Sequence, residues 1–250
     1  MSSALNVVAL IGSPTSSATS RTLLLVRHLL EALQQRLHAS VTLVELAPIA
    51  RSLGQSLTRA EVEPAVEQAL ATVESADLLV VATPVYRGSY PGLFKHLVDF
   101  IELEALVDTP VLLAATGGSE RHALVIDHQL RPLFSFLQAH TLPIGVYATP
   151  ADFDGVQINS TALQARIALA FSALSLPASQ RALLFATRHL SQELERQILP
   201  DGGHRGRNPE MPVDLLIHPL PPRPTYPAHA LTPTPALLPA IARMLPMLLL

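Results

Sequence analysis

A cluster of hydrogen-bond donors lies near the N-terminus, between a run of apolar residues and a run of leucines. Seven of the ten residues from 13 to 22 carry hydroxyl groups: Ser13, Thr15, Ser16, Ser17, Thr19, Ser20 and Thr22. Arg21 adds a guanidinium to this hydroxyl loop. Together these groups can give a terminal phosphate monoester the many short hydrogen bonds that it accepts. A second interpretation stays open, in which the loop only caps a helix, because Ser and Thr are ordinary N-cap residues.

The segments on either side of the hydroxyl loop predict where an anion would bind. Residues 7–11 form an apolar run typical of a buried strand, and a helical pattern begins at Ser20. In an open parallel sheet, the first strand-to-helix turn points its amides at the crevice beyond the strand, and the helix adds about half a positive charge there. Gly12 is the only nearby glycine, so the loop is neither a dinucleotide fingerprint nor a P-loop.

Two further loops follow predicted strands. The first begins with "TPVYRGSYPG" at Thr83, and the second is "AATGGSERHAL" from Ala114. Gly117 and Gly118 leave the backbone uncovered, which would let a flat ring approach the amides, although a glycine pair is also a common plain turn. If the sheet is doubly wound, the three loops share one edge. Together they predict a mononucleotide lying across the switch point of that sheet.

Short β-branched runs alternate five times with stretches of helical period, which predicts an α/β fold with a central parallel sheet. We expect strands at residues 7–11, 41–45, 78–82, 111–115 and 144–148. We expect helices on both faces of the sheet, at residues 20–37, 64–74, 93–103, 121–138 and 160–174.

The composition excludes several classes of function. The net charge is only −3 and there is no basic run, so we expect no nucleic-acid partner. Cysteine is absent, which excludes disulfides and thiolate chemistry. The ten histidines show no metal-binding spacing, so we expect no metal site. No segment reads as a signal peptide or a membrane span, and a cytoplasmic location with no membrane partner is expected.

Prolines are concentrated at the C-terminal end, where 12 of the 22 fall in residues 200–250. Proline removes amide donors and blocks helices, so we expect this extension to be irregular or disordered. The sequence therefore predicts an α/β domain at residues 1–176, an additional helix at 177–199 and a proline-rich extension at 200–250.

The chain resembles the NADPH-dependent FMN reductases of flavodoxin-like fold, particularly the alkanesulfonate and methanesulfonate type. The resemblance rests on "GSP" from Gly12, "SRT" from Ser20, "TPVYRGSYPGLFKHL" from Thr83, "ATGGS" from Ala115 and "HALVIDHQLRPLFSFLQA" from His122. It extends to about residue 175. It implies a doubly wound sheet of five parallel strands in the order 2-1-3-4-5, and an enzyme that transfers a hydride from NADPH or NADH to FMN.

The resemblance also implies which residues bind the flavin. The phosphate would be held by Ser13, Ser20, Arg21 and Thr22. The ribityl chain and ring would border Pro84, Val85, Tyr86 and Arg87. The isoalloxazine would contact Thr116, Gly117, Gly118 and Ser119. No catalytic side chain is expected, because the cofactors carry the chemistry of hydride transfer.

The resemblance implies two kinds of partner. The reduced FMN would supply a two-component monooxygenase, and the chain would form a homodimer or a homotetramer. His128 stands where alkanesulfonate-type members often have a tyrosine, in a distorted helix at a subunit interface. This difference favours the methanesulfonate type.

Two alternative functions share the fold. A flavodoxin-type electron carrier would hold FMN permanently, but such carriers are typically strongly acidic, and this chain has a net charge of −3 and no tryptophan. An FMN-dependent quinone or azo reductase would share both the fold and the flavin site, so the sequence separates it poorly.

Overall fold

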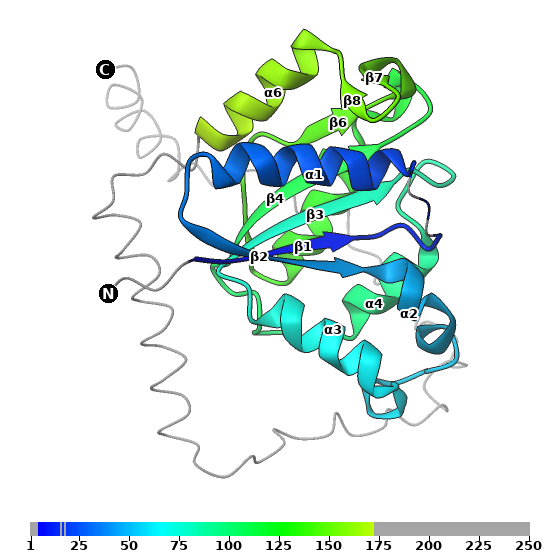
Figure 1. Cartoon of the computed structure of the whole chain (residues 1–250). Helices are drawn as coiled ribbons and strands as arrows, with labels where there is room; N and C mark the ends of the chain where they lie inside the picture. The colour runs from blue at the N-terminus through cyan, green and yellow to red at the C-terminus, as the bar shows by residue number, and fades with distance from the viewer. Residues whose placement is uncertain (1–4, 16, 18, 173–250) are drawn as a thin grey trace, which may run out of the picture. The chain divides into compact units, whose positions relative to one another are not determined.

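The computed structural model describes residues 5–15, 17 and 19–172, and these form an α/β domain with a parallel sheet (Figure 1). The four long strands are β1 (Leu5–Ile11), β2 (Ala39–Glu45), β3 (Leu78–Pro84) and β4 (Pro110–Thr116). Their order in space is β2-β1-β3-β4, and the fifth place beside β4 is shared by β5 (His140–Thr141) and β6 (Val146–Ala148). All of these pairs are parallel. The predicted flavodoxin-like order is confirmed.

The fifth position differs in detail from the prediction of one strand at residues 144–148. It contains two short strands, because Pro143 and Gly145 interrupt the pairing with β4. Arginines satisfy the carbonyls that the interruption releases. Arg131 donates to the carbonyls of Leu142 and Pro143, at 2.8 and 3.3 Å, and Arg166 donates to that of Gly145 at 2.8 Å.

Helices cover both faces of the sheet, as predicted (Figure 1). On one face lie α1 (Arg21–Gln34) and α6 (Thr161–Ser172). The other face is covered by α2 (Leu46–Leu53), α3 (Pro64–Glu74), α4 (Gly92–Asp99) and α5 (Arg131–Phe136). The remaining short elements are η1 (Arg59–Glu61), η2 (Glu120–His122), η3 (Ile126–Leu130), η4 (Pro150–Asp152), β7 (Phe153–Asp154) and β8 (Gln157–Ile158).

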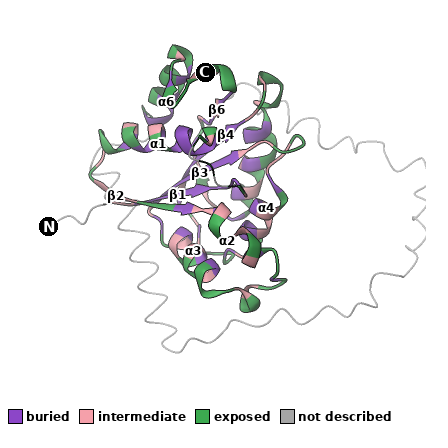
Figure 2. Cartoon of the chain, turned by 45° about the vertical axis from the view of Figure 1, so that its right-hand side comes forward, coloured by how far each residue is buried: buried purple, intermediate pink, exposed green. Residues whose placement is uncertain are grey.

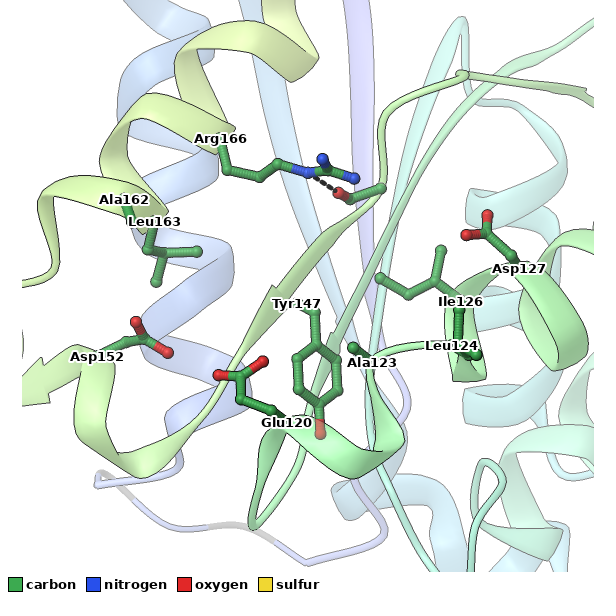
Figure 3. Close-up of a pocket in the computed structure, with 11 residues that line it drawn as sticks. Glu120, Ala123, Leu124, Ile126, Asp127, Tyr147, Asp152, Ala162, Leu163 and Arg166 are labelled. Atoms are coloured by element: carbon green, nitrogen blue, oxygen red, sulfur yellow. Dashed lines mark hydrogen bonds between the residues drawn. The ribbon is translucent and has the colours of Figure 1, made fainter.

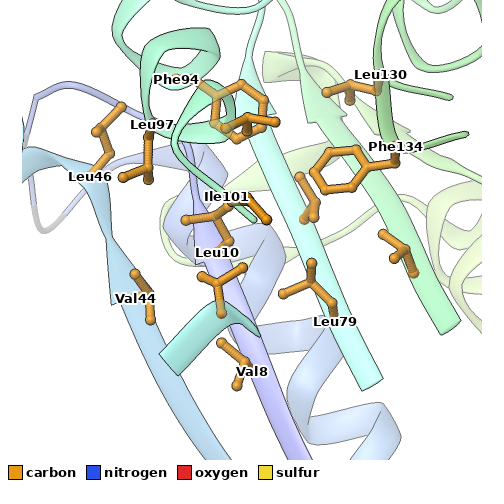
Figure 4. Packing of buried hydrophobic residues seen from close by; sticks show 14 of the residues in the cluster. Val8, Leu10, Val44, Leu46, Leu79, Phe94, Leu97, Ile101, Leu130 and Phe134 are labelled. Atoms are coloured by element: carbon orange, nitrogen blue, oxygen red, sulfur yellow. The ribbon is translucent and has the colours of Figure 1, made fainter. Parts of the chain in front are cut away.

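Alternate residues of the strands enter two separate cores, because successive side chains of a strand point to opposite faces. Val8, Leu10 and Leu79 pack against α2 to α5, as Figure 4 shows for part of this core. Val7, Ala9 and Val80 pack against α1 and α6. The middle strands are therefore buried on both sides, as Figure 2 shows. This rigid sheet fixes the edge from which the three predicted loops emerge.

The prediction of one continuous helix at residues 121–138 is wrong. The structure has the 3₁₀ turn η2, then the π-helical turn η3, and only then α5. Pro132 gives a physical reason, because it has no N–H to donate to the carbonyl of His128, four residues earlier, and the α-helical pattern cannot pass through it. His128 lies inside the π-helical turn, so the helix is distorted at this position.

Arg59 ties η1 to two neighbouring elements. Its guanidinium donates to Glu67 and Glu74 of α3, to Glu102, and to the carbonyl of Phe100. These carboxylates raise the pKa of Arg59 above its ordinary value. In turn, the hydrogen bond from Arg59 lowers the pKa of Glu67.

The described residues end at 172, so the predicted helix at 177–199 and the proline-rich extension at 200–250 lie outside them, and the predicted domain boundaries stay predictions. Across the part of the chain that the structure describes, every helix is too short or too polar to cross a bilayer.

Candidate functional site

A cavity of about 320 Å³ lies at the carboxyl edge of the sheet, where the loops after β1, β3 and β4 meet. Its lining residues are Ser13, Thr15, Ser17, Thr19, Ser20, Arg21, Thr22, Pro84, Val85, Tyr86, Thr116, Gly117, Gly118 and Pro150. Ten of the twelve predicted site residues are among them. Arg87 and Ser119 are not.

The hydroxyl loop opens onto the N-terminus of α1. Ser20 is the N-cap residue, and its side chain accepts a hydrogen bond from the amide of Leu23 at 3.4 Å. The first turn of α1 contains no acidic residue, and Arg21 is exposed and has no ion-pair partner among the described residues. The positive end of the helix dipole and a free guanidinium therefore face the same cavity. This arrangement favours an anion.

Hydrogen bonds hold the hydroxyl loop and join it to β4. Ser13 is buried, and its hydroxyl donates to the carbonyl of Thr15 at 2.9 Å. The hydroxyls of Thr22 and Thr116, both buried, lie 2.7 Å apart and share a hydrogen bond. This pair connects the first turn of α1 to the end of β4, so the donors of the two loops keep a fixed relation.

The loop after β3 is a tight hairpin turn. The backbones of Tyr86 and Ser89 hydrogen-bond to each other in both directions, at 2.7 and 3.0 Å. Arg87 and Gly88 between them have φ values of 52° and 83°, the left-handed pair that a type I′ turn requires. The turn leaves Tyr86 on the cavity and Arg87 exposed outside its lining.

The two glycines after β4 have different surroundings. A Cβ on Gly117 would lie 1.9 Å from the hydroxyl oxygen of Tyr147, whereas a Cβ on Gly118 would have no described residue within 4 Å apart from its chain neighbours. The amides of Gly118 and Ser119 have no acceptor among the described residues. Gly118 therefore has open space and a free donor beside it, while the absent side chain at Gly117 is explained by contact with Tyr147.

Four lining residues are absent from the twelve that the resemblance implies. Thr15, Ser17 and Thr19 belong to the hydroxyl loop, whose composition was a sufficient signal. Pro150 follows β6, and the rule that carboxyl ends of parallel strands meet at one edge indicates that its loop belongs there.

A local capping interaction holds Pro150 in place. Asp152 accepts hydrogen bonds from the amide and hydroxyl of Thr149, at 2.8 and 2.9 Å. Burial alone would raise the pKa of Asp152, but the hydrogen bonds from Thr149 and Ser160 outweigh burial and lower the pKa. The carboxylate therefore stays ionised and keeps this short loop closed.

Comparisons with known proteins identify related sequences. Residues 5–154 match the family described as NADPH-dependent FMN reductase. A Pseudomonas putida protein named NADH-dependent FMN reductase SfnE is 63% identical over 170 residues, which cover 68% of this chain and 90% of the relative. A Pseudomonas aeruginosa protein named FMN reductase (NADPH) is 58% identical over 170 residues, with the same coverage.

Two solved structures are similar in three dimensions. A crystal structure of an oxidoreductase from Corynebacterium diphtheriae has a TM-score of 0.61 and 33% identity, and the match covers 74% of this chain and 99% of that one. The apo form of the NADH:FMN oxidoreductase EmoB has a TM-score of 0.59 and 27% identity, covering 70% of this chain and 91% of that one.

Proposed function

The chain belongs to the NADPH-dependent FMN reductase family, and from that premise we propose how its residues bind the flavin and which reaction sequence it serves. The protein is an NAD(P)H:FMN oxidoreductase. The observation that carries the proposed binding mode is the cavity at the N-terminus of α1, with hydroxyl donors and no acidic residue in the first turn.

The phosphate of FMN would bind at the hydroxyl loop. Ser20, Arg21 and Thr22 supply donors there, in addition to the positive end of α1. Hydrogen bonds to a charged group contribute about 1.5–3 kcal/mol each, so three of them would account for much of the roughly 8 kcal/mol that micromolar binding requires. Among the described residues that line this cavity, none is acidic and able to oppose an anion.

The isoalloxazine would lie against the loop after β4. Gly118 has the open space that close approach of a flat ring needs, and the amides of Gly118 and Ser119 are free to donate to its polar edge. Pro84, Val85 and Tyr86 would border the ribityl chain and the ring from β3. We leave Arg87 out of this set, because it lies outside the cavity lining.

FMN, when bound, accepts the hydride that the reduced nicotinamide donates, so no acid or base is needed from the protein. The residues of this chain would bind FMN, orient its ring and stabilise its charges. Arg21 and α1 would neutralise the phosphate charge. The free amides near Gly118 would stabilise negative charge that develops on the ring, because preformed donors need no reorganisation during the reaction.

The reduced FMN would serve a two-component monooxygenase of the alkanesulfonate or methanesulfonate type. This part of the proposal is supported by the sequence resemblance and by the similarity to the relative named NADH-dependent FMN reductase SfnE.

Turnover separates this function from that of an electron carrier. Purified protein is mixed with a large excess of free FMN and either NADH or NADPH, and nicotinamide oxidation is followed at 340 nm. We expect many equivalents of nicotinamide to be oxidised per protein chain. Oxidation that stops after one equivalent would overturn the proposed release of reduced FMN to a monooxygenase in favour of a carrier that keeps its flavin. Replacing FMN with a quinone or an azo dye as the acceptor tests the remaining alternative.

A further inference from the structure

Tyr147 lies directly behind the loop that lines the candidate flavin cavity. It belongs to β6, where its partner in the parallel register is Ala115 of β4, one residue before the strand ends at Thr116. In Figure 3 its ring points from β6 toward the segment that contains Glu120. Tyr147 does not line the flavin cavity itself. It lines a separate cavity of about 400 Å³, shown in Figure 3.

Two contacts attach the loop to β6. At its start, the amide of Gly117 donates to the carbonyl of Ala148 at 3.0 Å. At its end, the hydroxyl of Tyr147 donates to the carbonyl of Ser119 at 2.7 Å. The two anchors therefore bracket the Gly118 and Ser119 amides, which have no acceptor among the described residues.

The fit between Tyr147 and Gly117 is close. The hydroxyl oxygen and Cζ of Tyr147 would lie 1.9 and 2.9 Å from a Cβ on Gly117, so only glycine fits there without a shift of the ring. Burial, together with the charge of Glu120, raises the pKa of Tyr147 above its ordinary value of 10.0. The hydroxyl therefore stays protonated, and remains a donor, over the pH range in which the enzyme would act.

We propose that Tyr147 is a positioning residue for flavin binding: its hydroxyl anchors the Ser119 carbonyl and thereby holds the Gly118 and Ser119 amides in place for the isoalloxazine. This inference rests on the proposed flavin site. It adds a residue that acts from outside the cavity, through the loop after β4.

The test is Tyr147→Phe, which keeps the ring against Gly117 and removes only the anchoring hydroxyl. Dissociation constants for FMN and for riboflavin are measured by quenching of flavin fluorescence. The loop faces the ring and not the phosphate, so both constants should rise by a similar factor, about three- to tenfold for one lost neutral hydrogen bond. The visible circular dichroism of the flavin, at saturation, should also change, which a uniform loss of stability would not cause.

Tyr90→Phe is the matched control. It also removes one phenol hydroxyl, and that hydroxyl makes no hydrogen bond within the described residues. Its flavin affinities and spectrum should equal those of the unmodified protein. Unchanged affinities and spectrum in Tyr147→Phe would overturn the positioning role, and so would a loss confined to FMN. Failure of the unmodified protein to bind either flavin would instead overturn the proposed function.

Discussion

Gly117 and Gly118 are adjacent in the sequence, yet replacing each by alanine should have opposite effects. Neither has a φ in the left-handed region, so the backbone accepts alanine at both positions. At Gly117 the new methyl meets the hydroxyl of Tyr147 at 1.9 Å, whereas at Gly118 it meets no described residue within 4 Å apart from its chain neighbours. The first substitution should therefore damage the fold, and the second should obstruct the ligand.

The expected magnitudes follow from these contacts. In Gly117→Ala, overpacking costs about 1–3 kcal/mol, and losing the Tyr147 hydrogen bond adds about 0.5–1.5 kcal/mol. At about 2–4 °C per kcal/mol for a chain of this size, the melting temperature should fall by about 5–15 °C. In Gly118→Ala, the smaller entropy of the unfolded chain stabilises by about 0.4–1 kcal/mol, so the melting temperature should rise by about 1–4 °C.

The assay combines thermal unfolding, without flavin, with titration of FMN. Gly118→Ala should unfold no earlier than the unmodified protein but bind FMN at least about tenfold more weakly, because the methyl enters the space proposed for the ring. Two results would refute the reasoning: wild-type FMN affinity in Gly118→Ala, or wild-type stability in Gly117→Ala. Either result would mean that the contacts around the two glycines do not determine the stability of the loop or its affinity for FMN.

Three further substitutions test other parts of the structure. Arg21→Ala should weaken FMN binding at least about tenfold, for loss of a charged hydrogen bond, while riboflavin titrated in parallel should bind as before. Thr22→Val should cost about 1–3 kcal/mol in a urea melt, because it leaves the buried Thr116 hydroxyl unpaired, and adding Thr116→Val should recover most of this loss. Arg59→Gln should lower the unfolding free energy by about 1–3 kcal/mol at neutral pH. Part of this stability comes from Glu67, because its hydrogen bond with Arg59 lowers its pKa in the folded state. That part of the difference in unfolding free energy should be complete above the ordinary pKa of 4.5 and should disappear as the pH falls through the lowered pKa. Urea melts from pH 7 to pH 3 measure it.

The sequence predicted the sheet well because its middle strands are buried on both faces. Such strands appear as continuous apolar runs, and the predicted runs at 7–11 and 111–115 lie within β1 and β4. The edge of the sheet was harder to predict. Pro143 and Gly145 divide the fifth strand, but the carbonyls that they release are satisfied by Arg131 and Arg166, 11 and 21 residues away, and no local pattern records such contacts.

In the candidate site, too, features set by neighbouring residues could be predicted, and features set by distant residues could not. The hydroxyl loop could be predicted because its donors lie close together in the sequence. The structure brings Ser13, Ser20 and Thr22 to one cavity. The different roles of Gly117 and Gly118 could not be predicted from the sequence, since they differ because of the ring of Tyr147, thirty residues away. By contrast, α2 was not predicted although its buried residues Leu46, Ile49 and Leu53 have the spacing of one helical face.

The hydroxyl loop and the N-terminus of α1 are proposed to bind the phosphate of FMN. The most direct measurement is an isothermal titration of the unmodified protein with FMN and, separately, with riboflavin, which has the same ring and ribityl chain but no phosphate. Two charge-assisted hydrogen bonds of about 1.5 kcal/mol each predict that FMN binds at least about 100-fold more tightly than riboflavin. Equal dissociation constants for the two flavins would contradict the account.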